Sequence, residues 1–202
     1  MDFWSKIFGQ KPKPEELLQA CIAGDFQKAL TLIQAKVNVN ALLRDYEKEA
    51  EMQKIGSSSS VDKMYTTPLY KSVSANNFEL VKLLVNKGAD VNLVADDRGS
   101  PLSQAAFNGC FEIVQYLIKK GANCNMANKD GYRPIEAALL GHRAFEVVHM
   151  IDFKLESAFK SIVEELILAG TNLRNRPGGQ PAYVLAMSIW PEIAPIIKEH
   201  IV

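Results

Sequence analysis

Two segments of the chain that begin 33 residues apart have nearly the same sequence. The first begins at Thr67 and reads TPLYKSVSANNFELVKLLVNKGADVN, and the second begins at Ser100 and reads SPLSQAAFNGCFEIVQYLIKKGANCN. A third start, RPIEAALLGH, follows at Arg133 after the same interval. A repeat of this length is one supersecondary unit, which buries its apolar face only against its neighbours. The period therefore predicts a stack of similar units and not a domain with one central core.

Each regular repeat is predicted to be a pair of helices. Thr67 can accept a hydrogen bond at a helix start, and Pro68 suits the first helical position, where a missing N–H costs nothing. Asn76 and Gly109 stand at the turn between the two helices, and both residue types tolerate a left-handed backbone. The pattern predicts helix starts at Thr67, Ser100 and Arg133 and helix ends near Gly88 and Gly121. Apolar residues at helical spacing predict a core between repeats, made by Leu69, Val73, Val81, Leu84, Leu102, Ala106, Val114, Leu117 and Ile135.

The T-P-L opening, the period of 33 and the G-A-D-V-N ending resemble the ankyrin repeat. The resemblance covers roughly residues 15–200 and is specific for 66–142. It implies an all-α fold, a solenoid of stacked antiparallel helix pairs with short finger loops. It also implies a non-catalytic protein–protein interaction module, because such a stack presents an extended surface that is already ordered before binding.

Five repeats are expected after an N-terminal helical segment at residues 1–14. Within a repeat domain at 15–202, they span about 15–41, 66–95, 99–128, 132–175 and 179–202. The first and the last depart from the consensus, which is common in terminal repeats that cap a stack.

Two inserts interrupt the period. The first, at 42–65, begins with LLRDYEKEAEMQKI and closes with GSSSSVDKM. It could form part of the binding face or be a solvated loop, and residues 56–61 are expected to be its most mobile part. The second lies within 142–165 and predicts an extra helix or two lengthened helices.

The N-terminal segment carries four apolar residues at the spacing of one helical face, namely Phe3, Trp4, Ile7 and Phe8. It could fold back over the first repeat, or dock on a membrane or a partner. It does not have the pattern of a signal peptide, and no run of about 18 apolar residues predicts a transmembrane helix.

Charge and cysteine usage narrow the range of partners. Lysine plus arginine and aspartate plus glutamate number 23 each, which argues against nucleic acid as the main ligand. Cys21, Cys110 and Cys124 show no CxxC spacing and are expected to be buried, reduced thiols. We expect a cytoplasmic monomer that binds another protein, with a membrane unlikely as partner.

Few residues suggest chemistry. His142, His149 and His200 have no metal-ligand spacing, and His142 is expected to be a polar surface residue near a helix turn. No catalytic motif, metal site or cofactor is predicted. Two alternatives stay open: an enzyme or metal-dependent regulator with its site in 142–175, and a membrane-peripheral scaffold anchored by residues 3–8.

The resemblance also implies where a partner would bind. In ankyrin-like stacks, the concave side is lined by residues just before the turn between helices and by finger tips. On this chain these positions are occupied by Phe107, Asn108, Tyr132, Leu140, Asp96, Asp97, Lys129, Asp130 and Ser74. Phe107 is the most informative, since an aromatic at the centre of a charged rim is typical of interfaces. The alternative is that the second insert or the N-terminal segment covers it. The function expected is a stand-alone adaptor, or an inhibitor or immunity-like binder.

Overall fold

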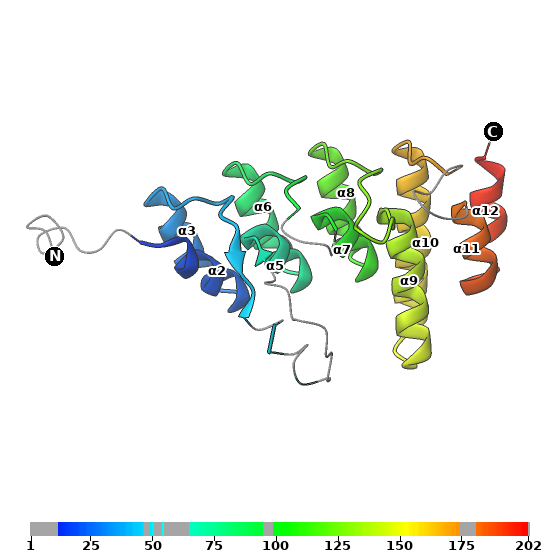
Figure 1. Ribbon diagram of the computed structural model, residues 1–202, viewed down its shortest axis with the longest axis horizontal. Helices are drawn as coiled ribbons and strands as arrows, with labels where there is room; N and C mark the ends of the chain where they lie inside the picture. Colours follow the sequence, from blue (N-terminus) through cyan, green and yellow to red (C-terminus); the bar gives the residue numbers. More distant parts are fainter. Residues whose placement is uncertain are drawn as a thin grey trace, which may run out of the picture. The chain divides into compact units, whose positions relative to one another are not determined.

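The computed structural model describes residues 12–46, 49–50, 54, 65–94, 99–173 and 181–201. These residues form five helix pairs and one short two-stranded ladder (Figure 1). The chain divides into two compact units, Met1–Ala89 and Asp90–Val202, and each is described by itself. The predicted all-α fold of packed helix pairs is confirmed.

The first unit contains two helix pairs. Its helices are α2 (Pro14–Ile22), α3 (Phe26–Gln34), α5 (Pro68–Ser74) and α6 (Phe78–Asn86). Helix α2 packs on α5, and α3 packs on α6. The turns between paired helices have left-handed residues at Gly24 and Asn76, as the sequence predicted for Asn76. The two pairs are therefore stacked in the same orientation.

The two ends of the first insert pair with each other. Strand β1 (Leu43–Arg44) runs antiparallel to β2 (Tyr65–Thr66), with Leu43 opposite Thr66. Just after β1, the buried carboxylate of Asp45 lies 3.0 Å from the Lys71 ammonium on α5. The beginning of this insert is therefore packed on a helix of the stack and is not a solvated loop. Residues 56–61, which we expect to be mobile, lie outside the described part of the chain.

The second unit contains three helix pairs. Its helices are α7 (Pro101–Phe107), α8 (Phe111–Lys119), α9 (Pro134–Val147), α10 (Phe153–Leu168), α11 (Ala182–Ile189) and α12 (Ala194–Glu199). Helix α9 packs against both α7 and α11, and α10 packs against α8 and α12. The pair α9–α10 is therefore the middle layer of this unit.

The predicted helix boundaries are confirmed. Thr67 Oγ1 accepts from the Tyr70 amide at 3.0 Å, and Ser100 Oγ accepts from the Ser103 amide at 3.1 Å. Arg133 takes the same place before α9. Helices α6 and α8 end two residues before Gly88 and Gly121, both of which have a positive φ.

The second insert lengthens the two helices of repeat four. Helix α9 has 14 residues where α7 has 7, and α10 has 16 where α8 has 9. The α9–α10 hairpin consequently extends beyond the α7–α8 turn (Figure 1). A Cβ on Gly109, in that turn, would lie 2.7 Å from Leu155 Cδ1 and 3.2 Å from the Phe159 ring. The first turns of α10 thus pack directly on the α7–α8 turn.

A ladder of asparagines joins neighbouring repeats within each unit. One asparagine after each second helix donates from its side chain to the carbonyl of the glycine that ends the next repeat. The three bonds are Asn40 to Gly88 at 2.9 Å, Asn92 to Gly121 at 3.1 Å and Asn125 to Gly170 at 3.3 Å. Two of these side chains also accept a backbone N–H of the next repeat, from Asn123 and from Asn172. The ladder satisfies finger backbone groups that would otherwise have to bind water.

The predicted core is buried, and one of its leucines gives a direct test. All nine predicted residues are at most 1% exposed. We expect Leu117→Ala to lower the free energy of unfolding by about 2–5 kcal/mol, through lost burial and a cavity. Leu168→Ala on α10, where the side chain is 81% exposed, should change it by less than about 0.5 kcal/mol. Equal denaturant midpoints for the two variants would contradict the assignment of Leu117 to the core.

Candidate functional site

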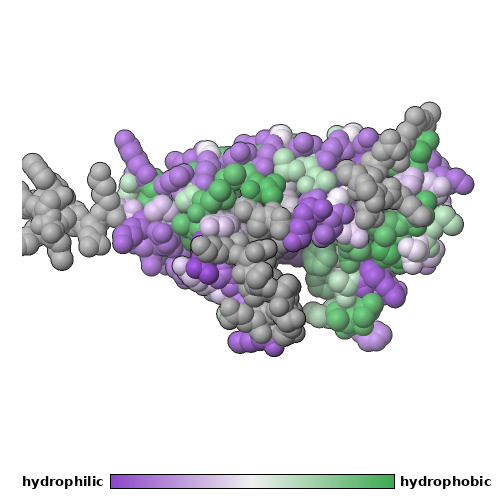
Figure 2. Space-filling view, in the orientation of Figure 1, coloured by the Kyte–Doolittle hydropathy of each residue, from purple (hydrophilic) through white to green (hydrophobic). Residues whose placement is uncertain are grey.

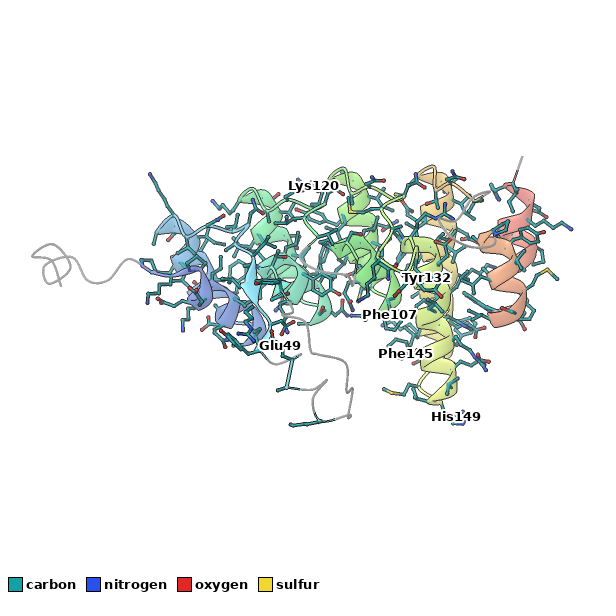
Figure 3. The ribbon with its side chains drawn as sticks, in the orientation of Figure 1. Glu49, Phe107, Lys120, Tyr132, Phe145 and His149 are labelled. Atoms are coloured by element: carbon teal, nitrogen blue, oxygen red, sulfur yellow. The ribbon has the colours of Figure 1, made fainter. Side chains whose placement is uncertain are left out.

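Most of the predicted binding residues lie where α7, α9 and one finger meet in the second unit. Phe107 is the last residue of α7 and is 38% exposed, while Asn108 follows it as the C-cap. Leu140 on α9 is half-buried. Tyr132, which lies before α9 and is labelled in Figure 3, is half-buried too. Lys129 and Asp130 are exposed between α8 and α9. Ser74 is exposed at the end of α5 in the first unit, and Asp96 and Asp97 lie outside the described residues.

The position of Phe107 is fixed by a close helix contact. A Cβ on Gly141 would lie 2.0 Å from the Phe107 carbonyl oxygen, so only glycine permits this approach of α9 to α7. Leu140 is the neighbour of Gly141 and therefore lies next to the end of α7. The side chain of Phe107 keeps its exposure although the second insert extends past it. The described part of the insert therefore leaves the ring partly exposed.

The finger that carries Lys129 and Asp130 is closed by Asn128. Asn128 Oδ1 accepts from the amides of Asp130 at 3.0 Å and Tyr132 at 2.9 Å. The Asn128 amide in turn donates to the Tyr132 carbonyl at 2.9 Å. This local network holds the two charged residues at the tip of the turn and Tyr132 at its base. The finger is therefore ordered before any partner binds, which lowers the entropy lost on binding.

A buried ion pair anchors the base of the same finger. Arg133 Nη2 donates to Glu136 Oε1 at 2.6 Å, and Arg133 Nε donates to Glu136 Oε2 at 3.2 Å. Both side chains are buried, and Arg133 also donates to the Asn172 carbonyl beyond α10. The sequence contains a sign of this pair, because arginine replaces the Thr or Ser of the other repeats and glutamate follows three residues later.

A second exposed surface was not predicted at all. Between the lengthened helices, four large apolar side chains are 58% to 87% exposed, namely Val147, Val148, Met150 and Phe153. We call residues 147–153 the hairpin tip. Figure 2 shows hydrophobic residues, in green, at the lower end of the α9–α10 hairpin. Figure 3 labels His149 at the same end of the hairpin. Apolar residues gathered on an exposed tip are typical of interaction sites.

The expectation for His142 was wrong. His142 lies inside α9 and is 4% exposed, with its ring stacked on Trp190 at 3.8 Å between centroids and edge-on to Phe159 at 5.8 Å. It is aligned with the turn residue Gly109, but α9 continues through this position. The left-handed turn residue is instead His149, with a φ of 55°. His142 and His149 are thus in different environments, since the first is buried and the second is exposed.

The cysteines and acids of the described residues do not form a chemical centre. Cys21, Cys110 and Cys124 are free and buried, as predicted, and burial raises the pKa of Cys110 to about 11. A thiol with such a pKa is protonated at neutral pH and is a poor nucleophile. Across the described ranges, no three His, Cys, Asp or Glu residues come together as metal ligands would.

The structure gives no membrane-spanning helix among the described residues, because none of these helices is both long enough and apolar enough. The N-terminal residues considered for membrane docking lie outside the described ranges, namely Phe3, Trp4, Ile7 and Phe8.

Comparison with known proteins supports the repeat assignment. The family model of ankyrin repeats in three copies matches residues 16–128 and, in a second overlapping match, residues 69–151. Together these matches span 16–151, which is well over half of the chain. No curated protein matches the sequence significantly.

Proposed function

This chain belongs to the ankyrin-repeat family, whose repeats generally mediate protein–protein interactions, and we propose that it is a non-catalytic module that binds one partner protein. The observation that supports this most directly is the exposed Phe107, held by the α7–α9 contact beside Leu140 and an ordered finger. An aromatic residue next to apolar and charged neighbours has the composition of a binding hot spot.

The partner surface that we propose in the second unit consists of Phe107, Asn108, Tyr132, Leu140, Lys129 and Asp130. Asp96, Asp97 and, in the first unit, Ser74 are proposed as separate partner contacts. Phe107 and Leu140 provide the apolar centre, and the finger provides the charged rim. We infer that the protein acts as a stand-alone adaptor, or as an inhibitor or immunity-like binder, and that it does so as a cytoplasmic monomer.

Removing the aromatic ring should separate binding from stability. Phe107→Ala is expected to weaken the complex by about 2 kcal/mol, or roughly 30-fold in Kd, as hot-spot truncations do. The free energy of unfolding should change by less than about 1 kcal/mol, because a partly exposed ring leaves no closed cavity. Leu168→Ala, which also removes an exposed apolar side chain, is the control and should bind like the wild type.

The partner can be identified with a photo-crosslinking residue at position 107 and, as control, at position 168. A protein that is crosslinked from position 107 but not from position 168 is the candidate partner. Calorimetric titration of the purified pair would then give the Kd. A partner that binds Phe107→Ala and wild type equally would contradict the proposed surface. Lys129→Glu should act mainly on the association rate and its salt dependence, since Lys129 belongs to the rim.

The hairpin tip is a second candidate for the partner surface, supported by its exposed apolar side chains. Replacing Val147, Val148, Met150 and Phe153 by serine tests it. If this variant loses the partner while Phe107→Ala retains it, the tip is the partner surface. If both lose it, the partner spans α7 and the whole length of α9.

A further inference from the structure

One buried histidine has no part in the proposed binding surface. The ring of His142 lies between α9, its own helix, and the two elements that contain Phe159 and Trp190. It stacks almost parallel to the Trp190 ring, at an interplanar angle of 6°. Trp190 caps α11 and is itself buried. His142 is therefore one of the contacts that attach the C-terminal pair α11–α12 to the rest of the second unit.

One nitrogen of this ring is unsatisfied. Nδ1 of His142 is buried and has no hydrogen-bond partner among the described residues. In the neutral tautomer with the proton on Nε2, Nδ1 carries only a lone pair. In the imidazolium, Nδ1 carries an N–H that has no acceptor, on a ring that now bears a charge. Burying such a group is much more costly than burying the neutral ring.

Charged groups surround the ring from three elements. Glu146 and Arg143 lie on α9, Glu156 lies on α10, and Glu192 lies in the turn after α11. The three carboxylates favour the imidazolium, as does stacking on the Trp190 face, whereas Arg143 opposes it. Burial is the largest influence, and the net result is a pKa of His142 below its ordinary 6.5. The arrangement in which α11–α12 is packed on α9 and α10, which we call the closed state, thus favours the neutral form of the His142 ring.

We propose that protonation of His142 loosens α11–α12 from α9 and α10, so that the C-terminal helix pair detaches in mildly acidic solution. The sign follows from linkage. In the detached state the ring is solvated and takes up a proton at its ordinary pKa of 6.5, while the closed state takes it up only at lower pH. The closed state is fully favoured above pH 6.5 and loses this advantage as the pH falls from 6.5 towards the lowered pKa. Detachment would expose Trp190, together with the apolar faces of α9 and α10 that the pair α11–α12 covers.

Hydrogen exchange of the full-length chain tests this. Protection factors, corrected for the intrinsic rate, are measured at pH 7.5, 6.5 and 5.5 for peptides from 182–199, with peptides from 101–119 as internal reference. The range ends at pH 5.5, which lies above the ordinary pKa of a carboxyl group. We expect the ratio of the two protection factors to fall by no more than about twofold from pH 7.5 to 6.5, where half of the detached rings carry the proton. It should then fall several-fold by pH 5.5, and by no more than about tenfold for a single proton.

Three variants show which group is responsible. His142→Phe keeps an aromatic ring on Trp190 but cannot titrate, and it should abolish the fall. His149→Gln and His200→Gln remove the two exposed histidines and should keep it. The wild-type ring supplies an independent readout if His142→Phe does not fold, since its NMR titration should have a midpoint below 6.5. A midpoint at or above 6.5, or protection of 182–199 that follows 101–119 at every pH, would overturn the proposal. Neither outcome bears on whether Phe107 binds a partner.

Discussion

Gly141→Ala is expected to destabilise the second unit by about 3 kcal/mol or more. A Cβ at this position would lie 2.0 Å from the Phe107 carbonyl oxygen, 2.7 Å from its carbon and 2.9 Å from its Cα. All three are backbone atoms of α7, which cannot rotate away as a flexible side chain would. Helices α7 and α9 must therefore separate by about 1 Å or more, and the core between them loses its close packing.

An opposing effect is smaller. Alanine in a helix interior is favoured over glycine by about 1 kcal/mol, which offsets only part of the overpacking. For a chain of this size, the net loss corresponds to a fall in Tm of roughly 6–12 °C, which circular dichroism would detect. Ala144→Gly, the reverse change at an exposed position of the same helix, should cost about 1 kcal/mol. A Tm for Gly141→Ala at or above that of the wild type would show that α7 and α9 can separate without loss.

Glu136→Ala is expected to lower the free energy of unfolding by about 3–5 kcal/mol. The variant leaves the guanidinium of Arg133 buried without its carboxylate, and an uncompensated buried charge is among the most costly defects in a folded protein. The loss reflects the isolated arginine and not the worth of the pair. Chemical denaturation of the single variant measures it.

A double variant separates the cost of an unpaired buried arginine from the contribution of the ion pair. Arg133→Met with Glu136→Leu removes both charges and keeps most of the volume, so it should recover much of the stability that Glu136→Ala loses. If the double variant is as unstable as the single one, the pair itself holds the start of α9.

Local signals allowed most of the helix pairs to be predicted. Thr67 and Ser100 accept hydrogen bonds at helix starts, and Asn76 and Gly109 adopt the left-handed backbone that their types tolerate. These properties depend on a few neighbouring residues, so the period of 33 repeats them reliably. The course of α9 was also readable in principle, because His142 replaces the Asn or Gly of the turn and gives the helix no reason to stop.

Contacts between distant residues could not be predicted. His142 and Trp190 are far apart in sequence, and the stacking of their rings depends on how α11 packs against the lengthened α9. The exposure of Phe153 was equally hidden, because an apolar residue in a helical pattern normally indicates core. Only the position of the hairpin end, beyond the neighbouring repeat, leaves it in solvent. The proposed binding residues remain predictions, although the structure brings Phe107 and the turn of α9 that contains Leu140 next to each other.

The asparagine ladder has a consequence for how such a chain can change over time. Its three bonds join residues that are 48, 29 and 45 positions apart in sequence, yet the contact is the same each time. Both inserts fall within the longer intervals. The register between repeats thus does not depend on the number of residues between the bonded positions. The two inserts, at 42–65 and within 142–165, mark positions where the stack accepts additional residues. Related proteins could gain new binding segments at these positions without a change in the contacts between repeats. For the same reason, a reporter domain could be inserted there by design.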